Sequence, residues 1–532
     1  MKNTYIYIIL LGVLSLSSCS LDTQPYTQLT DTNFYSSPDD ALTALIGCYD
    51  GMQVATGASG TGLPVASEVF SDNCFGGTGN ADGYNYAALD EFDISRAPSY
   101  VDLFNGNWVA YYKAIYRCNV LLSKMDQIEW GDDTATKNAY ESEARFIRAY
   151  IYFEMVRLWG NIPLLTEPST DNIPQATPDE VYTVIAEDLL FAANNLPDGA
   201  YSTIDSGRVT KWAAKSLLGR VYLYYTGYYG ASDLVGVISQ SEALTHLEDV
   251  ISSSGHGLVD DFASLWPVSS AHAGVEYSGE DNEEIVFSIR YTYTSDYNGN
   301  TDGNHWLVMF GMREFTYLPY GNGWGVTVNP KLWNAYNDTD TRKTATVISV
   351  DDEAIPFDKI DNQREYTGYY NKKYTPMSMV DPETGETVSA VTQFGVTDFQ
   401  INQFQDYVVL RYSDVLLMAA ELGSGNAQSY FDEVRQRAYG SNFTSINVSQ
   451  DAIMNERHLE FALEGVRYWD LLRQGVNTAA STIAETTDLL SGGVTETKTI
   501  NAANIIETNG LQQIPNTQIT LSDNVLKQNA GW

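Results

Sequence analysis

Apolar residues recur at spacings of three and four along much of the chain, and this periodicity constrains the fold more than any other feature. Between Tyr140 and Trp159 the pattern comprises Ala144, Ile147, Ile151, Met155 and Leu158. Such spacing places the apolar side chains on one face of an α-helix. Gly160 and Pro163 follow directly and predict the end of this helix.

The same periodicity predicts further helices near 107–127, 178–196, 209–226, 240–253, 408–421, 426–438 and 449–474. In one of them, Leu218-Gly219-Arg220-Val221-Tyr222 fits the L-G-x-x-Y part of a tetratricopeptide repeat. Ala149 stands three residues before Tyr152 in the same style. A small residue at such a position lets a neighbouring helix approach closely. We therefore predict antiparallel helix pairs of the tetratricopeptide type.

Two segments, 54–106 and 255–325, are long, rich in glycine and aromatic residues, and without sustained helical periodicity. Within 285–294 the alternation of Ile285, Phe287, Ile289 and Tyr291 predicts a short strand. Loops of this length inside a compact protein are usually functional or disordered, and the ring content argues against disorder. The predicted fold is mostly α, with long irregular loop insertions and a few short strands. The scaffold is assigned to 107–254 and 408–474, and ligand-binding insertions to 54–106 and 255–400, within one body over 19–532.

The N-terminus has the features of a secretory signal peptide. Lys2 precedes an apolar run from Ile6 to Leu16, which is shorter than the roughly 20 residues that span a bilayer. The run ends in Leu16-Ser17-Ser18-Cys19, which resembles the lipobox of bacterial lipoproteins. The resemblance implies removal of residues 1–18, acylation of Cys19 and attachment to a membrane through that lipid.

Net charge excludes one class of partner. The chain has 30 Lys and Arg against 68 Asp and Glu, a formal charge of −38, which repels the phosphate backbone of nucleic acids.

Besides Cys19, the cysteines are Cys48, Cys74 and Cys118, which allow at most one disulfide and one remaining thiol.

Motifs for catalysis and metal binding are missing from the sequence. None of the five His lies in an HExxH motif, and there is no G-x-S-x-G elbow or P-loop. We therefore predict that the protein is not an enzyme. Asp296, Asn298, Asn300 and Asp302 alternate as in an EF-hand loop, but Thr301 and Leu307 replace its glycine and final glutamate. No cofactor is predicted, with a structural calcium ion on these loops as the alternative.

Several blocks, in one order along the chain, carry a resemblance to the SusD/RagB family of outer-membrane nutrient-binding lipoproteins of Bacteroidetes. The blocks lie at 21–49, 143–150 with 157–164, 208–214, 410–421 and 456–471, and the chain closes on Gln528-Asn529-Ala530-Gly531-Trp532. The charged residues of the later blocks are expected to form ion pairs and caps around packed helices: Arg411, Asp414, Glu421, Glu456, Arg457, Glu464, Arg467 and Asp470.

The resemblance implies a superhelix of tetratricopeptide-like helix pairs that supports a more irregular ligand-binding part. It also implies a surface-exposed lipoprotein of the outer membrane that covers a SusC-like TonB-dependent transporter. Such a protein captures glycans and delivers them for import. The alternatives are the same architecture binding peptides, as RagB-type members do, and an assembly subunit that only closes the transporter.

Glycan binding also has a basis in the residues themselves. Tyr and Trp suit surfaces where one edge of a ring stays wet, and the chain has 37 Tyr and 10 Trp beside 19 Phe. A pyranose lays its C–H bonds on such a ring, and its hydroxyls need amides and carboxylates at the edge. The predicted stacking residues are Tyr84, Tyr293, Trp306 and Trp324, and the predicted hydrogen-bond partners are Asn73 and Asp82.

Overall fold

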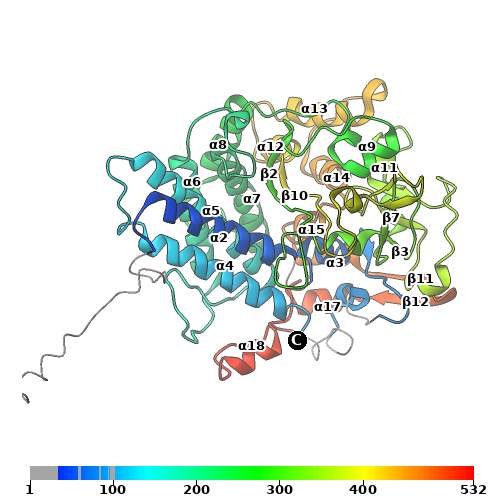
Figure 1. The fold of residues 1–532 in the computed structure, drawn as a ribbon, viewed down its shortest axis with the longest axis horizontal. Coiled ribbons are helices and arrows are strands. Elements are labelled where there is room, and N and C mark those ends of the chain that lie inside the picture. The colour runs from blue at the N-terminus through cyan, green and yellow to red at the C-terminus, as the bar shows by residue number, and fades with distance from the viewer. Residues whose placement is uncertain (1–33, 58–60, 83–85, 94, 96–101) are drawn as a thin grey trace, which may run out of the picture.

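The computed structural model in Figure 1 describes residues 34–532, except 58–60, 83–85, 94 and 96–101. The signal peptide, Cys19 and Tyr84 therefore lie outside the described residues. No helix of the described part combines the length and the apolar character that crossing a bilayer requires.

One half of the molecule is a succession of helices, each packed on the next. They are α2 (Pro38–Gly57), α4 (Asn105–Lys124), α5 (Thr134–Trp159), α6 (Pro178–Asn195), α7 (Lys211–Tyr229) and α8 (Gln240–Ser253). From α8 the contacts continue to α12 (Tyr412–Glu421) and then α13 (Ala427–Tyr439), although more than 150 residues separate α8 from α12 in sequence. This arrangement confirms the predicted mostly helical fold.

Local sequence signals explain where these helices begin and how closely they pack. Thr177 and Glu180 form a reciprocal capping box at the start of α6, which satisfies backbone N–H groups that lack helical partners. In α7, a Cβ atom built on Gly219 would lie 2.7 Å from Cδ2 of Leu247 in α8. The glycine of the L-G-x-x-Y motif is thus required by the close approach of the next helix.

Two predicted helices differ from the structure. Strand β10 (Tyr407–Arg411) overlaps the start of the predicted helix 408–421 and pairs antiparallel with β2 (Ile285–Ile289). The run Val408-Val409-Leu410 is apolar throughout, and such a short run does not separate strand from helix. The predicted helix 449–474 is split into α14 (Gln450–Glu460) and α15 (Arg467–Leu472), because Leu463 and Gly465 between them have φ of +67° and +78°.

The other half consists of short elements, most of which pack on the main apolar core, while a second, smaller apolar cluster is formed by Val268, Met312, Tyr320, Ile348, Val350, Ile355 and Tyr370. Its two-stranded sheets are β1 (Cys74–Phe75) with β5 (Thr327–Val328), β3 (Met312–Arg313) with β4 (Asn322–Gly323), β6 (Val347–Ser349) with β7 (Tyr369–Asn371), β8 (Ser378–Val380) with β9 (Thr387–Ser389), and β11 (Glu485–Ser491) with β12 (Val494–Ile500). The remaining helices are α3 (Leu63–Phe70), α9 (Pro267–Ala273), α10 (Pro330–Ala335), α11 (Arg342–Thr346), α16 (Val476–Ile483), α17 (Ala502–Glu507) and α18 (Asn516–Leu521). Short 3₁₀ helices are η1 (Tyr86–Glu91), η2 (Tyr201–Thr203), η3 (Phe262–Leu265), η4 (Leu307–Phe310), η5 (Ile360–Asn362), η6 (Ala390–Phe394) and η7 (Gly440–Asn442).

A buried ion-pair network joins the two halves. The guanidinium of Arg411 donates to Glu460 Oε1 at 2.8 Å and Glu464 Oε2 at 2.9 Å, and it also pairs with Glu284. The other charged residues of the family-like blocks pair too: Asp414 with Arg220 and Arg457, Glu421 with Arg473, Glu456 with Arg342 and Arg435, Arg467 with Asp72, and Asp470 with Arg457 and Arg473. The prediction that these residues form ion pairs around packed helices is confirmed.

The three cysteines within the described residues are buried free thiols. Cys48 and Cys118 face each other between α2 and α4, and burial raises the pKa of the Cys118 thiol well above its ordinary value. The disulfide that the sequence permitted is not formed among these three residues.

Candidate functional site

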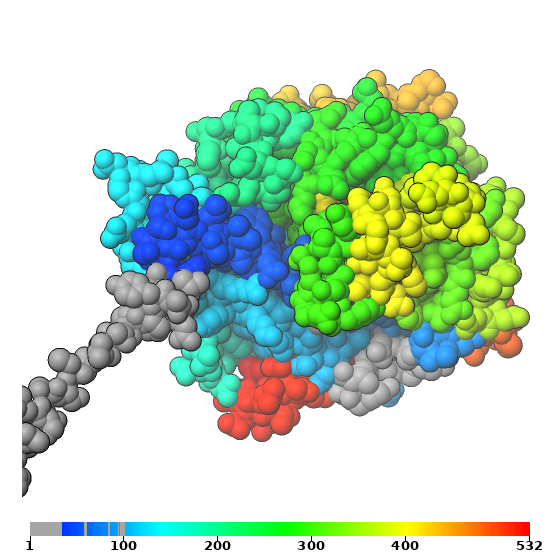
Figure 2. Space-filling view, in the orientation of Figure 1, coloured from blue at the N-terminus to red at the C-terminus, as the bar shows by residue number. Residues whose placement is uncertain are grey.

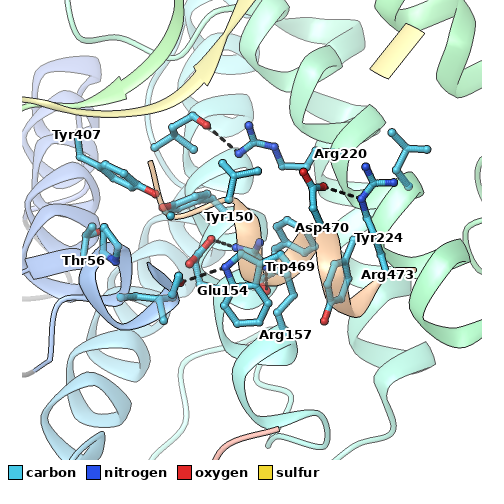
Figure 3. Close-up of a pocket in the computed structure, with 18 of the residues that line it drawn as sticks. Thr56, Tyr150, Glu154, Arg157, Arg220, Tyr224, Tyr407, Trp469, Asp470 and Arg473 are labelled. Atoms are coloured by element: carbon cyan, nitrogen blue, oxygen red, sulfur yellow. Dashed lines mark hydrogen bonds and ion pairs between the residues drawn. The ribbon is translucent and has the colours of Figure 1, made fainter. Parts of the chain in front are cut away.

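A polar hollow lies in the interior, where α5, α7, α15 and β10 meet (Figure 3). Its cavity volume is about 30 Å³, enough for a water molecule or two and too small for a sugar. Its charged groups are already engaged: Arg157 pairs with Glu154 and lies over the Trp469 ring at 4.5 Å. Arg220 pairs with Asp414 and donates to the Val409 carbonyl at 2.7 Å. The side chains around this hollow hold the packed elements together, and the candidate ligand sites lie at the surface.

One predicted ring lies in an exposed aromatic group, here called the Tyr293 shelf: Tyr293, Tyr297, Phe394 and Phe404. The rings of Tyr293 and Phe394 are parallel, with centroids 4.2 Å apart, and Phe404 meets Phe394 edge-on at 5.0 Å. Phe394 is 39% exposed and Tyr297 75% exposed. Asn402 holds the loop in place, because its Nδ2 donates to the carbonyls of Tyr293 and Ser295, each at 2.8 Å.

Polar groups surround the Tyr293 shelf. A hydrogen bond to the Asp398 carboxylate raises the pKa of the Tyr297 hydroxyl. His305 Nε2 lies 3.1 Å from Ser295 Oγ, and burial lowers the pKa of this imidazole. The histidine is therefore neutral at pH 7, and the shelf combines ring faces with hydrogen-bonding groups of the kind that a sugar requires.

A second surface group, here called the Trp324 patch, comprises Asp82, Arg313 and Trp324. Arg313 Nη1 donates to Asp82 Oδ2 at 3.0 Å, and its guanidinium lies 5.3 Å from the centroid of the half-buried Trp324 ring. Gly79 makes this contact possible, because a Cβ atom there would lie 2.1 Å from Arg313 Nη2. The structure thus brings together two predicted residues, Asp82 and Trp324, that are far apart in sequence.

Two predicted ligand contacts have to be corrected. Trp306 is only 2% exposed, and its ring packs against Phe310, Tyr374 and Tyr407. Asn73 is fully buried: its Nδ2 donates to Glu68 Oε2 at 2.8 Å, and its Oδ1 lies 2.7 Å from His458 Nε2. Neither side chain reaches the surface, so the structure places Trp306 and Asn73 in the interior and not where a sugar would contact them.

The sequence reasoning also missed functional candidates. Phe394 falls within the predicted insertion 255–400, Phe404 lies just beyond its end, and Arg313 lies between the predicted rings, yet none was singled out. The glycine that follows Phe394 has φ of +76°, a turn signal that could have marked this ring as part of a surface loop.

The alternating acids and amides of the EF-hand-like segment shape a turn, in which Asp296 accepts hydrogen bonds from the backbone N–H groups of Asn298 and Asn300. Within the described residues, no group of three or more His, Cys, Asp or Glu side chains is arranged to hold a metal.

Family models match both ends of the described chain. One, described as "Starch-binding associating with outer membrane", matches residues 50–223, and another, described as "SusD family", matches residues 355–532. Together they cover more than half of the sequence.

Individual relatives match over almost the whole length. A SusD-like protein P38 from Formosa agariphila is 26% identical over 514 residues, which is 88% of this chain and 90% of the relative. A SusD-like protein from Bacteroides ovatus is 25% identical over 504 residues, which is 87% of this chain and 81% of the relative.

Solved structures share the fold. A laminarin-binding SusD-like protein superposes with a TM-score of 0.71 at 27% identity, covering 94% of this chain and 100% of its own. Surface glycan-binding protein A from Bacteroides fluxus superposes with a TM-score of 0.76 at 23% identity, covering 93% and 100%. With the family models, the full-length relatives and this shared fold in agreement, the chain belongs to the SusD family.

Proposed function

We propose that this protein binds glycans at the cell surface and passes them to a SusC-like TonB-dependent transporter. The observation that carries the proposal is the Tyr293 shelf, where the parallel rings of Tyr293 and Phe394 lie at the surface beside Asp398 and His305. A flat aromatic face with polar groups at its rim suits a pyranose. The relative that shares 27% identity and is described as laminarin-binding supports the same ligand class.

Binding of the soluble chain, residues 20–532, to a panel of polysaccharides tests this proposal by calorimetry. We expect Tyr293→Ala and Trp324→Ala each to weaken binding of the glycan by roughly 1–3 kcal/mol, by analogy with base–aromatic stacking. Tyr116→Ala is the matched control, because Tyr116 is a surface tyrosine, 45% exposed, that lies on α4 in the helical half.

The control variant should bind as the wild type does. Full affinity in both the Tyr293→Ala and Trp324→Ala variants would remove these two surfaces from the proposal. Binding of peptides and of no glycan in the panel would replace the proposed ligand class with the peptide alternative.

We further propose that acylated Cys19 anchors the protein to the outer membrane. The lipobox-like Leu16-Ser17-Ser18-Cys19 supports this assignment. Cys19→Ala should abolish labelling by palmitate and move the protein from the membrane fraction to the soluble fraction, because acyl chains supply the hydrophobic attachment. Cys48→Ala, which alters a buried thiol, should leave the labelling unchanged. A Cys19→Ala variant that is still labelled and membrane-bound would contradict the anchor.

A further inference from the structure

Two hollows adjoin each other between α2, the loop that precedes α7, and strand β2. Their cavity volumes are about 340 and 320 Å³, within the roughly 300–1,000 Å³ typical of small-ligand sites. Both are lined by Ser206, Gly207, Arg208, Ser288 and Arg290. The two hollows therefore adjoin along these residues, where Arg290 Nη2 donates to Ser206 Oγ at 3.2 Å. Together they are here called the Arg290 trough, whose lining includes none of the predicted sugar-contact residues.

Arg290 is fixed in the middle of the trough. Its Nη1 donates to Asp406 Oδ2 at 2.6 Å and to Glu280 Oε2 at 3.2 Å, and its other terminal nitrogen pairs with Asp281. The side chains of Glu280 and Asp281 remain 47% and 61% exposed. The trough therefore presents held carboxylates whose remaining lone pairs face solvent.

One end of the trough has an aromatic wall with a polar atom that lacks a partner. The Tyr201 and His256 rings stack with centroids 4.3 Å apart, at an interplanar angle of 16°. His256 is 8% exposed, and its Nδ1 donates to the Glu283 carbonyl at 2.9 Å. Burial lowers the pKa of this imidazole to about 4, so the ring is neutral at pH 7. Its Nε2 is buried behind the wall and bonds to no described residue.

The charged residues that line the trough indicate which class of ligand it can bind. Acids outnumber bases among the lining residues, with Asp50, Asp205, Glu280, Asp281 and Asp302 against Arg208 and Arg290. Such a surface disfavours phosphates, sulfates and uronic acids. An uncharged polyhydroxyl ligand fits this lining, because sugar hydroxyls donate to the exposed carboxylates of Glu280 and Asp281.

The trough lies next to the Tyr293 shelf along one loop. Thr292 N donates to the Asp302 carbonyl at 2.8 Å, so residues 291–303 fold back on themselves, with Arg290 and Asp302 at the trough and Tyr293 on the shelf. The Cα atoms of Arg290 and Tyr293 lie at most about 11 Å apart, since a chain extends by no more than about 3.6 Å per residue. Figure 2 shows this segment, in green, between α2 in blue and the segment with Phe394, in yellow.

We infer that the Arg290 trough is a second carbohydrate subsite, which binds uncharged sugar residues of the same glycan chain beyond those stacked on the Tyr293 shelf. This inference rests on the proposed function. It adds that the ligand is a neutral glycan long enough to cross the 291–303 loop. The shelf contributes ring stacking, and the trough contributes the exposed carboxylates of Glu280 and Asp281, which accept hydrogen bonds from sugar hydroxyls.

The test measures affinity against chain length. Calorimetry would use malto-, cello- and laminarihexaose and the corresponding disaccharides, with Ser206→Trp, which fills the trough, and Asp281→Ala, which removes one exposed carboxylate. For the hexasaccharide that binds, we expect each trough variant to lose about tenfold in affinity, the equivalent of roughly 1.4 kcal/mol. The affinity for the matching disaccharide should stay unchanged, whereas Tyr293→Ala should weaken both.

Asp132→Ala, a change at an exposed acid outside the trough, should leave the affinity for the hexasaccharide at the wild-type value. Wild-type affinity for the hexasaccharide in both trough variants would overturn the trough alone, because the shelf would still bind. No binding of any of the three hexasaccharides to the wild-type protein would instead contradict the proposed function together with the trough.

Discussion

Replacing Arg411 by methionine is expected to lower the free energy of unfolding by about 3–5 kcal/mol, the usual cost of removing one partner from a buried ion pair. Arg411 is only 1% exposed, and its guanidinium contacts Glu284, Glu460 and Glu464. Methionine approximates the volume of the arginine stem but donates no hydrogen bond. The variant therefore keeps buried carboxylates that have lost their shared cation, and denaturant titration followed by circular dichroism measures the loss.

The pH dependence of this loss identifies its electrostatic origin. Burial alone would raise the pKa of Glu460, but the guanidinium groups of Arg437, Arg411 and Arg342 hold it well below 4.5. A carboxylate with a depressed pKa in the folded state contributes stability above its unfolded pKa, and this contribution is lost as the pH falls through the folded value. In Arg411→Met part of that contribution is already missing, so the difference from the wild type should be largest near pH 7 and shrink below about pH 4.5.

Arg117→Met is the matched control, because Arg117 pairs with Asp50 at the surface, with side chains 46% and 41% exposed. Exposed pairs contribute about 0–1 kcal/mol, so this variant should unfold close to the wild-type midpoint. An Arg411→Met variant as stable as this control, or a loss that does not change with pH, would show that the buried network does not hold the two halves together.

The network also shows what the sequence could predict and what it could not. The charged residues of the family-like blocks could be assigned to ion pairs, because so many charges on apolar helices need partners. The identity of the partners could not be read in advance, since Glu284 lies 127 residues before Arg411 and is brought there only by the pairing of β2 with β10. That pairing was itself missed, because an apolar run preceding α12 fits a helix and a strand equally well.

For the candidate site, the sequence showed which residue types could contact a sugar, but it did not show which of these side chains are buried. Tyr293, Asp82 and Trp324 were selected by chemistry, and the structure places all three at or near the surface. Trp306 and Asn73 have the same chemistry but lie inside, because their neighbours come from distant segments: Gly57 and Gly62 against the indole, and His458 beside the amide. Such contacts depend on how α3 and α14 pack, which local sequence patterns do not encode.

Trp306 and Trp324 should therefore respond to alanine substitution in opposite ways. Trp306→Ala should lower the free energy of unfolding by about 3–5 kcal/mol, the range for removing a large aromatic side chain from a packed core. Built Cβ atoms on Gly57 and Gly62 would lie 2.6 and 2.9 Å from the nearest atoms of this ring, so the backbone there fits closely against the indole. Trp324→Ala removes a half-buried ring whose main partner is Arg313, and its effect should appear in glycan affinity. Denaturant midpoints and calorimetry on both variants provide the comparison. A Trp306→Ala protein that is as stable as the wild type but no longer binds glycan would restore Trp306 as a ligand contact.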